Sequence, residues 1–408
     1  WGGCLADDMG LGKTLQVFFF FSYMKSKNIR GSITNLVVAP TSLLFNWKNE
    51  VEKCVPHLNV LGHWGPNRQK DSKEWSEKDI ILTTYAIVTN DINIFKDYEF
   101  TCAVLDESQA IKNVAAQRYK AVMLIKAKNR FALTGTPIEN NTLELFAQMQ
   151  FLNPGMLGSF NFFRNEYSNA IDKGNEPEKA EELKKLIYPF ILRRTKEQVA
   201  KDLPPKTEMV LYCEMESEQR SVYDTFKAEF RKHLLNKIDD EGMNKSRFLV
   251  LDALLKMRQI CDSPALLNTE EDYGNTSIKI DELMRHITEK TGKHKVLVFS
   301  QFLKMLEMIS ARLSSEKIPF VRLDGSTRNR QEIVDKFQTD ENCRVFIISL
   351  KAGGVGLNLT AADYVYLVDP WWNPAVETQA IDRTHRIGQT SHVFAYRMIC
   401  KDTVEEKI

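Results

Sequence analysis

The first sixteen residues, WGGCLADDMGLGKTLQ (residues 1–16), decide how the chain is interpreted. Residues 10–14, GLGKT, form a glycine loop that leads into a helical pattern. Such a loop points backbone N–H groups at a bound phosphate, and the helix N-terminus favours the negative charge. Lys13 would neutralise the β- and γ-phosphates, and Thr14 would ligate Mg²⁺. The usual spacing has a further glycine where Asp7 stands, so an ordinary glycine loop is the alternative.

A second motif supplies the acidic groups that a nucleotide site needs. The stretch CAVLDESQ, residues 102–109, is an apolar strand pattern that ends in two carboxylates. Asp106, at the carboxyl end of a strand, can hold Mg²⁺ through water, and Glu107 can polarise an attacking water. A solvated acidic turn is the alternative, but a phosphate loop upstream argues against it. ATP and Mg²⁺ are therefore the expected cofactors.

Two arginines near the C-terminus are candidates for a further catalytic role. In QAIDRTHRIGQ, residues 379–389, Arg383 and Arg386 stand three positions apart, which predicts one helical face. Arginines on a second lobe can stabilise the γ-phosphate charge of a nucleotide on the first. A surface charge cluster is the alternative. His385 between them is assigned to packing or polar support rather than to catalysis.

Short apolar runs alternate with helical patterns in both halves of the chain. Continuous runs of apolar residues separated by helices are typical of parallel strands buried on both faces. The expected strands are residues 36–39, 80–82, 102–105 and 131–133 in the first half, and residues 296–299, 320–323, 345–348, 364–368 and 393–396 in the second. The predicted fold class is α/β, with a parallel sheet flanked by helices in each of two lobes.

Charge-dense helical patterns interrupt each half. We expect the first lobe over residues 1–203, with a helical insertion near 140–200, and the second lobe over 204–408, with an insertion near 212–272. KDLPPK, residues 201–206, is the expected linker, because paired prolines stop a helix and stiffen the crossing. No strand is expected ahead of the phosphate loop.

Composition and charge exclude some classes of protein. The net charge is +1, from 55 basic and 54 acidic residues, and gives no global argument for a nucleic-acid partner. The longest apolar stretch, residues 15–23, is shorter than the roughly 20 residues that span a bilayer, so no membrane partner is expected. The seven dispersed cysteines, without a Cys-x-x-Cys pair, indicate buried thiols in a reducing compartment.

The motifs together resemble the SWI/SNF family of ATP-dependent DNA translocases, within helicase superfamily two. The resemblance covers essentially the whole chain and rests on an ordered set of motifs: LADDMGLGKTLQ, VVAPTSLLFNW, ILTTYAIV, LDESQAIKN, LTGTPIEN, ILRRTKEQVAKDLPPK, VLVFSQF, LDGST, SLKAGGVGLNLT, VDPWWNP and QAIDRTHRIGQ. It implies two RecA-like lobes with ATP between them and duplex DNA across their top.

The resemblance also implies roles for individual residues. It implies that Gly10, Gly12, Lys13 and Thr14 bind phosphate and Mg²⁺, and that Asp106 and Glu107 form the acidic box. It implies that Arg383 and Arg386 are arginine fingers, which contact the γ-phosphate, and that Gln389 supports them. It implies contacts with the DNA backbone for Thr41, Ser42, Thr83, Thr84, Ser326, Thr327, Ser349, Gly353 and Gly354. Hydroxyls and backbone amides suit this role because they bind phosphate without reading bases. Trp372 resembles a tryptophan that faces the DNA groove, with a core aromatic as the alternative.

The implied function is a DNA-stimulated ATPase that translocates along double-stranded DNA and remodels or displaces a bound protein complex. RNA polymerase is one candidate cargo. A strand-separating DNA or RNA helicase of the same superfamily is an alternative, although no wedge hairpin is recognisable. A nucleotide-dependent binding scaffold without catalysis is a second alternative, which the intact charged residues disfavour.

Departures from the family pattern add three expectations. The acidic box reads Asp-Glu-Ser-Gln rather than Asp-Glu-Ala-His, so Gln109 is expected to couple ATP to DNA differently. The box, and the lack of a recognisable targeting module, favour a bacterial member in the cytoplasm at the nucleoid; a eukaryotic member would be nuclear. The adenine-contacting glutamine motif and the bracing C-terminal helix are missing, so the chain is expected to be a core cut from a longer protein.

Overall fold

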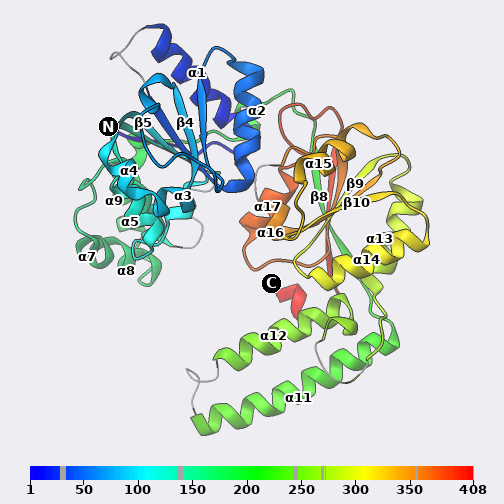
Figure 1. The fold of residues 1–408 in the computed structure, drawn as a ribbon. Helices are drawn as coiled ribbons and strands as arrows, with labels where there is room; N and C mark the ends of the chain where they lie inside the picture. The colour runs from blue at the N-terminus through cyan, green and yellow to red at the C-terminus, as the bar shows by residue number, and fades with distance from the viewer. Residues whose placement is uncertain are drawn as a thin grey trace. The chain divides into compact units, whose positions relative to one another are not determined.

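The computed structural model describes residues 1–27, 34–135, 141–241, 247–267, 271, 273–353 and 357–407. The chain divides into two compact units, Trp1–Asp202 and Leu203–Ile408. Each unit is built on its own parallel sheet flanked by helices (Figure 1). The α/β fold class with two RecA-like lobes is therefore confirmed.

The first unit contains a seven-stranded parallel sheet in the order β3-β4-β2-β5-β6-β1-β7. Its strands are β1 Gly3–Leu5, β2 Asn35–Ala39, β3 Val60–His63, β4 Ile80–Thr84, β5 Glu99–Leu105, β6 Lys126–Leu133 and β7 Ile191–Leu192. β2 and β4 are buried along their whole length, and β5 is buried beyond its first residue. Burial on both faces explains why these strands form continuous apolar runs in the sequence.

Helices cover this sheet and form the first insertion. They are α1 Lys13–Ser26, α2 Leu44–Cys54, α3 Tyr85–Asn90, α4 Ile92–Asp97, α5 Gln117–Met123, α6 Thr142–Leu152, α7 Phe160–Phe163, α8 Asn169–Asp172, α9 Pro177–Ile187 and α10 Lys196–Val199. α6 to α9 occupy the stretch in which an insertion is expected. α2 packs on the sheet because Leu44, Trp47 and Val51 recur on one helical face and are buried.

The expectation that no strand precedes the phosphate loop is wrong. Gly3–Leu5 forms β1, which lies inside the sheet between β6 and β7. Its three residues include one glycine, so they give no apolar run. Gly2 is required just before this strand, because an added Cβ would come within 2.5 Å of the Leu152 backbone oxygen.

The start of the chain is bound to the segment that follows the first insertion. Beyond β1 and β7, the Ala6 N–H donates to Leu192 O at 2.7 Å and the Asp8 N–H donates to Arg194 O at 3.0 Å. Asp7 is completely buried, and its carboxylate accepts the Arg194 backbone N–H at 2.9 Å and the Arg194 Nε–H at 3.1 Å. Burial raises the pKa of Asp7, but the hydrogen bonds, led by those from Arg194, outweigh it and hold the pKa below its usual value. Asp7 therefore anchors the loop in the place where a glycine was expected.

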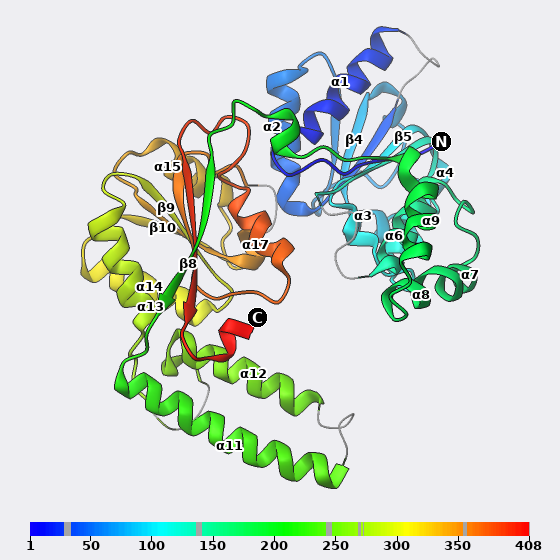
Figure 2. The same cartoon turned by 180° about the vertical axis from the view of Figure 1, so that it is seen from behind.

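The second unit contains a six-stranded parallel sheet in the order β10-β11-β9-β12-β13-β8. Its strands are β8 Lys206–Cys213, β9 Lys295–Ser300, β10 Phe320–Leu323, β11 Val345–Ser349, β12 Ala362–Leu367 and β13 Val393–Cys400. Its helices are α11 Ser217–Glu241, α12 Arg247–Asp262, α13 Ile278–Arg285, α14 Leu303–Ser315, α15 Arg330–Thr339, α16 Leu350–Gly353 and α17 Pro374–Ile381. α11 and α12 lie side by side beyond one end of this sheet, in the expected insertion (Figures 1 and 2).

A buried lysine joins the returning end of this insertion to the end of the described chain. Lys279 of α13 donates from Nζ to Asp262 Oδ1 at 2.9 Å, to Glu405 Oε1 at 2.7 Å and to Val368 O at 2.8 Å. The side chains of Lys279, Asp262 and Glu405 are all fully or almost fully buried. Burial lowers the pKa of Lys279, but the two carboxylates outweigh it and hold the pKa well above its usual value. The ammonium group therefore links α12, the residue that follows β12 and the C-terminal segment.

None of the helices that the structure describes combines the length and the apolar character that crossing a bilayer requires.

We expect Asp7→Asn to destabilise the first unit by about 2 kcal/mol, because the Arg194 guanidinium loses its charged acceptor. Hydrogen exchange of β1 and β6 peptides in the full chain measures the change. Glu181→Gln is the matched control, since Glu181 and Lys184 form an exposed pair 3.6 Å apart, worth less than about 0.5 kcal/mol. Equal protection in both variants would contradict the prediction.

The ion pair between Asp7 and Arg194 also predicts that the stability of the first unit depends on pH. Because the folded state holds the pKa of Asp7 below its unfolded value of about 3.9, the stabilisation is present above that value and is lost as pH falls through the folded pKa. Asp7→Asn removes this acid-sensitive contribution.

In the second unit, we expect Lys279→Met to destabilise the fold by roughly 3–5 kcal/mol, because it leaves two buried carboxylates without their cation. Hydrogen exchange of β9 and β12 peptides measures the loss. Lys401→Met, which removes the cation of an exposed pair with Glu214, is the control and should cost less than about 1 kcal/mol. A Lys279 variant as protected as the control would refute the assignment.

Candidate nucleotide site

The loop after β1 has the backbone shape of a phosphate loop. Gly10 and Gly12 have φ values of 86° and 73°, in the left-handed region that glycine adopts without strain. Gly12 is the N-cap of α1, which begins at Lys13 and continues through the half-buried Thr14. The first N–H groups of a helix have no partners within the helix, so this turn can bind an anion.

The predicted lysine is hydrogen-bonded to its own loop and feels the charges of the acidic box. Lys13 Nζ donates to Asp7 O at 2.6 Å and to Asp8 O at 3.3 Å. Burial lowers the pKa of Lys13 below its usual value, and the charges of Glu107 and Asp106 only partly offset this effect. The ammonium group therefore lies within electrostatic reach of both carboxylates, and the two halves of the predicted site meet within the first unit.

Two N–H donors fix the carboxylate of Asp106. Trp47 Nε1 donates to Asp106 Oδ2 at 2.7 Å, and the Glu107 backbone N–H donates to Oδ1 at 2.9 Å. The hydroxyl of Tyr85 also donates to the Asp106 backbone oxygen at 2.7 Å. Burial, with the neighbouring charge of Glu107, raises the pKa of Asp106 to about 7 despite these donors. A bound cation would favour the ionised form of this carboxyl.

The second carboxylate of the box stands on a strained backbone. Glu107 has a φ of 47°, in the left-handed region that non-glycine residues rarely adopt. Gln109 Nε2 donates to Glu107 Oε2 at 2.7 Å, and Thr134 Oγ1 donates to Gln109 Oε1 at 3.2 Å. The glutamine that replaces the usual histidine therefore bridges the box to the segment after β6.

The residues predicted to contact DNA in the first unit differ in exposure. Thr41 is exposed and Ser42 is half-buried, in the short 3-10 helix η1 (Thr41–Leu43) that precedes α2. Thr83 is completely buried and its hydroxyl donates to His63 O at 2.8 Å. Thr84 is buried and caps α3. In this arrangement Thr41 and Ser42 are accessible, whereas Thr83 and Thr84 serve the fold.

The residues predicted to contact DNA in the second unit also make local contacts. Ser326 Oγ donates to Asp324 Oδ1 at 2.6 Å, and Thr327 Oγ1 accepts the Asp324 N–H at 3.0 Å. The buried Ser349 caps α16, at whose end Gly353 lies; Gly354 lies outside the described residues.

Trp372 is 50% exposed, which excludes the core alternative. The Arg258 guanidinium lies 5.6 Å from its ring centroid. The role of Trp372 toward DNA stays a prediction.

The prediction of one helical face for the two arginines is wrong. α17 ends at Ile381, and Arg383 and Arg386 lie in the turns that follow. The Thr384 hydroxyl donates to Ile381 O at 2.7 Å and helps to end the helix there. Arg383 is buried and Arg386 is half-buried. Their role as fingers stays a prediction.

The polar residues around these arginines hold the turn together. Gln389 Nε2 donates to Ala362 O at 2.9 Å and to Thr384 O at 3.2 Å. His385 Nε2 lies 2.8 Å from Pro204 O, which agrees with the assignment of polar support. The contribution of Gln389 to nucleotide binding stays a prediction.

Trp47 and Arg194 are residues of this site to which the sequence patterns give no role. Both stand inside the recognised motifs, so their positions carried a signal. Their partners, Asp106 and Asp7, lie 59 and 187 positions away in the sequence. Only the folded sheet reveals such pairs.

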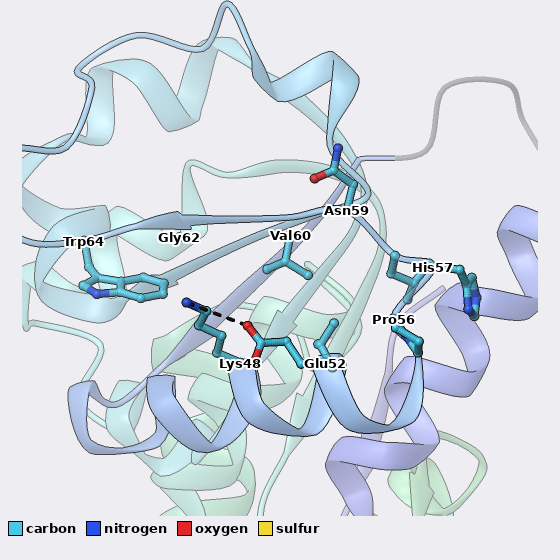
Figure 3. A pocket seen from close by; sticks show the side chains of 10 residues that line it. Lys48, Glu52, Pro56, His57, Asn59, Val60, Gly62 and Trp64 are labelled. Carbon is cyan, nitrogen blue, oxygen red and sulfur yellow. Dashed lines mark ion pairs between the residues drawn. The ribbon is translucent and has the colours of Figure 1, made fainter. Parts of the chain in front are cut away.

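A pocket of about 740 Å³ lies between α2 and β3 (Figure 3). Lys48, Glu52, Val60 and Trp64 are among its lining residues, and Lys48 pairs with Glu52 at 3.8 Å. It contains none of the residues predicted to bind nucleotide, and its lysine is already paired. The loop after β1 stays the predicted nucleotide site.

Two family models match the chain. The SNF2-related domain matches residues 1–266, and the helicase conserved C-terminal domain matches residues 278–388. The first match includes the phosphate loop and the acidic box, and the second includes both arginines.

Curated relatives align along the entire chain. YwqA of Bacillus subtilis, provisionally described as an ATP-dependent helicase/translocase, is 38% identical over 419 residues. The TATA-binding protein-associated factor MOT1 of Saccharomyces cerevisiae is 34% identical over 474 residues. Each alignment covers 100% of this chain but only 45% and 25% of these relatives, respectively, so the chain spans less than half of their length.

A solved structure agrees with these matches. The Sulfolobus solfataricus SWI2/SNF2 ATPase core in complex with dsDNA is 40% identical, with a TM-score of 0.50. The match covers 100% of this chain and 85% of that one. Since the SNF2-related model alone spans more than half of the residues, the chain belongs to the SNF2 family of SWI/SNF-type helicase-like proteins.

Proposed function

We propose that this chain is a DNA-stimulated ATPase that translocates along double-stranded DNA and remodels or displaces bound protein complexes. The observation that carries the proposal is the placement of Lys13 within electrostatic reach of Asp106 and Glu107, beside a glycine turn of the required shape. The names of its relatives, an ATP-dependent helicase/translocase and an ATPase core in complex with dsDNA, support the same activity.

The residues present fit ATP and Mg²⁺. The glycine turn and the ammonium group of Lys13 supply donors for the β- and γ-phosphates. Thr14 and Asp106 would hold Mg²⁺, and the raised pKa of Asp106 fits a carboxyl that gains from a neighbouring cation. When bound, Mg²⁺ supplies charge neutralisation on the phosphates. Glu107 would orient and polarise the attacking water, and Gln109 holds the carboxylate in place for that task.

Arg383 and Arg386 are proposed to stabilise the charge that develops on the γ-phosphate. Arginine suits this role because its planar guanidinium presents several donors and stays charged. Gln389 is proposed to support them by holding the turn in which they lie.

DNA is proposed to bind through its phosphates. Thr41 and Ser42 in the first unit, and Ser326, Thr327 and Trp372 in the second, are exposed or half-buried members of the predicted set. Phosphate contacts make binding largely independent of sequence and strongly dependent on salt.

A DNA-bound protein complex is the proposed cargo. MOT1 carries the name of a TATA-binding protein-associated factor, which supports a protein on DNA as the target class. RNA polymerase is one candidate in a bacterial cell, where the protein would act in the cytoplasm at the nucleoid. In a eukaryotic cell it would act in the nucleus.

We expect Lys13→Ala and Glu107→Gln each to lower DNA-stimulated ATP turnover by at least about 100-fold. The first variant loses the phosphate cation, and the second loses the base that polarises water. Phosphate release with and without duplex DNA measures the effect, and Lys184→Ala, at an exposed position of the same unit, is the control. Turnover near that of the control in either variant would refute the ATPase assignment and leave the scaffold alternative.

Translocation and strand separation predict opposite results with two DNA substrates. We expect ATP-dependent displacement of the third strand from a triplex, because a motor moving along a duplex pushes off what is bound in the groove. A forked duplex should stay annealed. The Glu107→Gln variant should displace neither the third strand of the triplex nor a strand of the fork. Unwinding of the fork without triplex displacement would establish the helicase alternative instead.

A further inference from the structure

Trp47 connects three parts of the first unit through one buried side chain. It is 1% exposed, on the inner face of α2. On one side, its indole N–H donates to Asp106 Oδ2 at 2.7 Å. On the other side, its ring meets Phe18 of α1 edge-to-face, with centroids 5.0 Å apart and an interplanar angle of 82°. Both elements of the nucleotide site, the phosphate-loop helix and the acidic box, therefore touch this indole.

The helix that carries Trp47 directly follows the short 3-10 helix that holds the accessible hydroxyls of the first unit. Thr41 and Ser42 lie in η1, and α2 follows without a break at Leu44. Trp47 therefore lies fewer than two helical turns beyond the proposed DNA contact. A helix moves as a rigid body over this length, so a displacement of its N-terminal end also moves the indole.

The acceptor of the indole distinguishes this contact from ordinary packing. A buried tryptophan N–H needs a partner, and a backbone carbonyl would satisfy that need. Here the partner is the carboxylate proposed to hold Mg²⁺, and its other oxygen accepts the Glu107 N–H. One donor comes from the acidic box itself and the other from α2. The orientation of the carboxylate therefore depends on where α2 lies.

We propose that Trp47 is a positioning residue that couples DNA contact at η1 to the orientation of the Asp106 carboxylate. This inference rests on the proposed function and adds its regulation: DNA engaged at Thr41 and Ser42 fixes α2, and Trp47 transmits that constraint to the metal-binding carboxylate. The indole does not touch nucleotide or DNA in this role.

Trp47→Phe tests the proposal in the full chain, because it keeps an aromatic ring against Phe18 and removes the N–H. Trp75→Phe is the matched control, since Trp75 is equally buried in the same unit but packs among Phe95, Phe100 and His63. Both variants lose one buried indole. Only the first loses a donor to the acidic box.

Three measurements separate positioning from stability. Electron paramagnetic resonance measures Mn²⁺ binding to the protein with bound ADP, and the dissociation constant should rise roughly tenfold in Trp47→Phe, as expected for loss of a hydrogen bond to a charged group. The ratio of kcat with DNA to kcat without DNA should fall by a similar factor. The dissociation constant for duplex DNA should change less than about twofold. Trp75→Phe should match the wild type in all three.

The outcomes are distinguishable from failure of the proposed function. If wild-type turnover rises with DNA but Trp47→Phe keeps both the Mn²⁺ affinity and the stimulation ratio, the inference is overturned and the proposed function stands. If the Mn²⁺ affinity falls while the ratio holds, Trp47 positions the carboxylate but the coupling is overturned. If the wild type is not stimulated by DNA, the proposed function fails, and the coupling fails with it.

A second substitution guards against misfolding of Trp47→Phe. Trp47→3-benzothienylalanine keeps the bicyclic shape and lacks only the N–H. The same losses in Mn²⁺ affinity and stimulation ratio support the proposal, and wild-type values for this variant overturn it.

Discussion

A completely buried carboxylate, that of Asp7, fixes the glycine loop that follows β1. Charge is rarely buried without a partner, and here Arg194 supplies both its guanidinium and its backbone N–H. The first residues of the chain are thereby held against the segment that returns from the helical insertion. The shape of the phosphate loop therefore depends on a contact between two residues that lie 187 positions apart in the sequence.

The second unit also holds the end of its insertion with a buried charge, but there the central buried group is a cation rather than a carboxylate. Its insertion returns through Asp262 at the end of α12, and the cation of Lys279 joins that carboxylate to Glu405 near the end of the described chain. In both units an ion pair with a fully buried member closes the insertion onto a segment distant in sequence. Such pairs add little net stability compared with apolar packing, but their geometry is specific. Each pair therefore specifies which distant segment the returning chain contacts.

The strands that contain a largely apolar run of three or more residues, and the chemistry-bearing motifs, could be predicted from the sequence, because such runs are typical of buried strands and phosphate chemistry needs fixed residue types. The strands β1, β3, β7 and β8 could not, because they are short or only partly buried. The helical spacing of Arg383 and Arg386 misled for a different reason. A spacing of three describes a face only if the helix continues, and Thr384 helps to end it.

The motifs also did not reveal which of their residues are buried in the folded protein and therefore cannot contact DNA in this structure. Thr83 looks like a phosphate ligand in the sequence, yet its hydroxyl is used by the neighbouring strand. The roles of Trp47 and Arg194 stayed hidden because a sequence pattern reports what a segment is, and not which distant segment it meets. Long-range pairs of this kind form the second layer of the site, beneath the residues that the motifs identify.

The backbone of Glu107 has a consequence for how this sequence can change. A left-handed conformation at a residue with a side chain costs roughly 1 kcal/mol, whereas glycine and asparagine accept it more readily. Replacement by either residue would relax the backbone and remove the carboxylate at the same time. At this position the backbone favours glycine or asparagine, whereas the proposed role in turnover needs the carboxylate of Glu107.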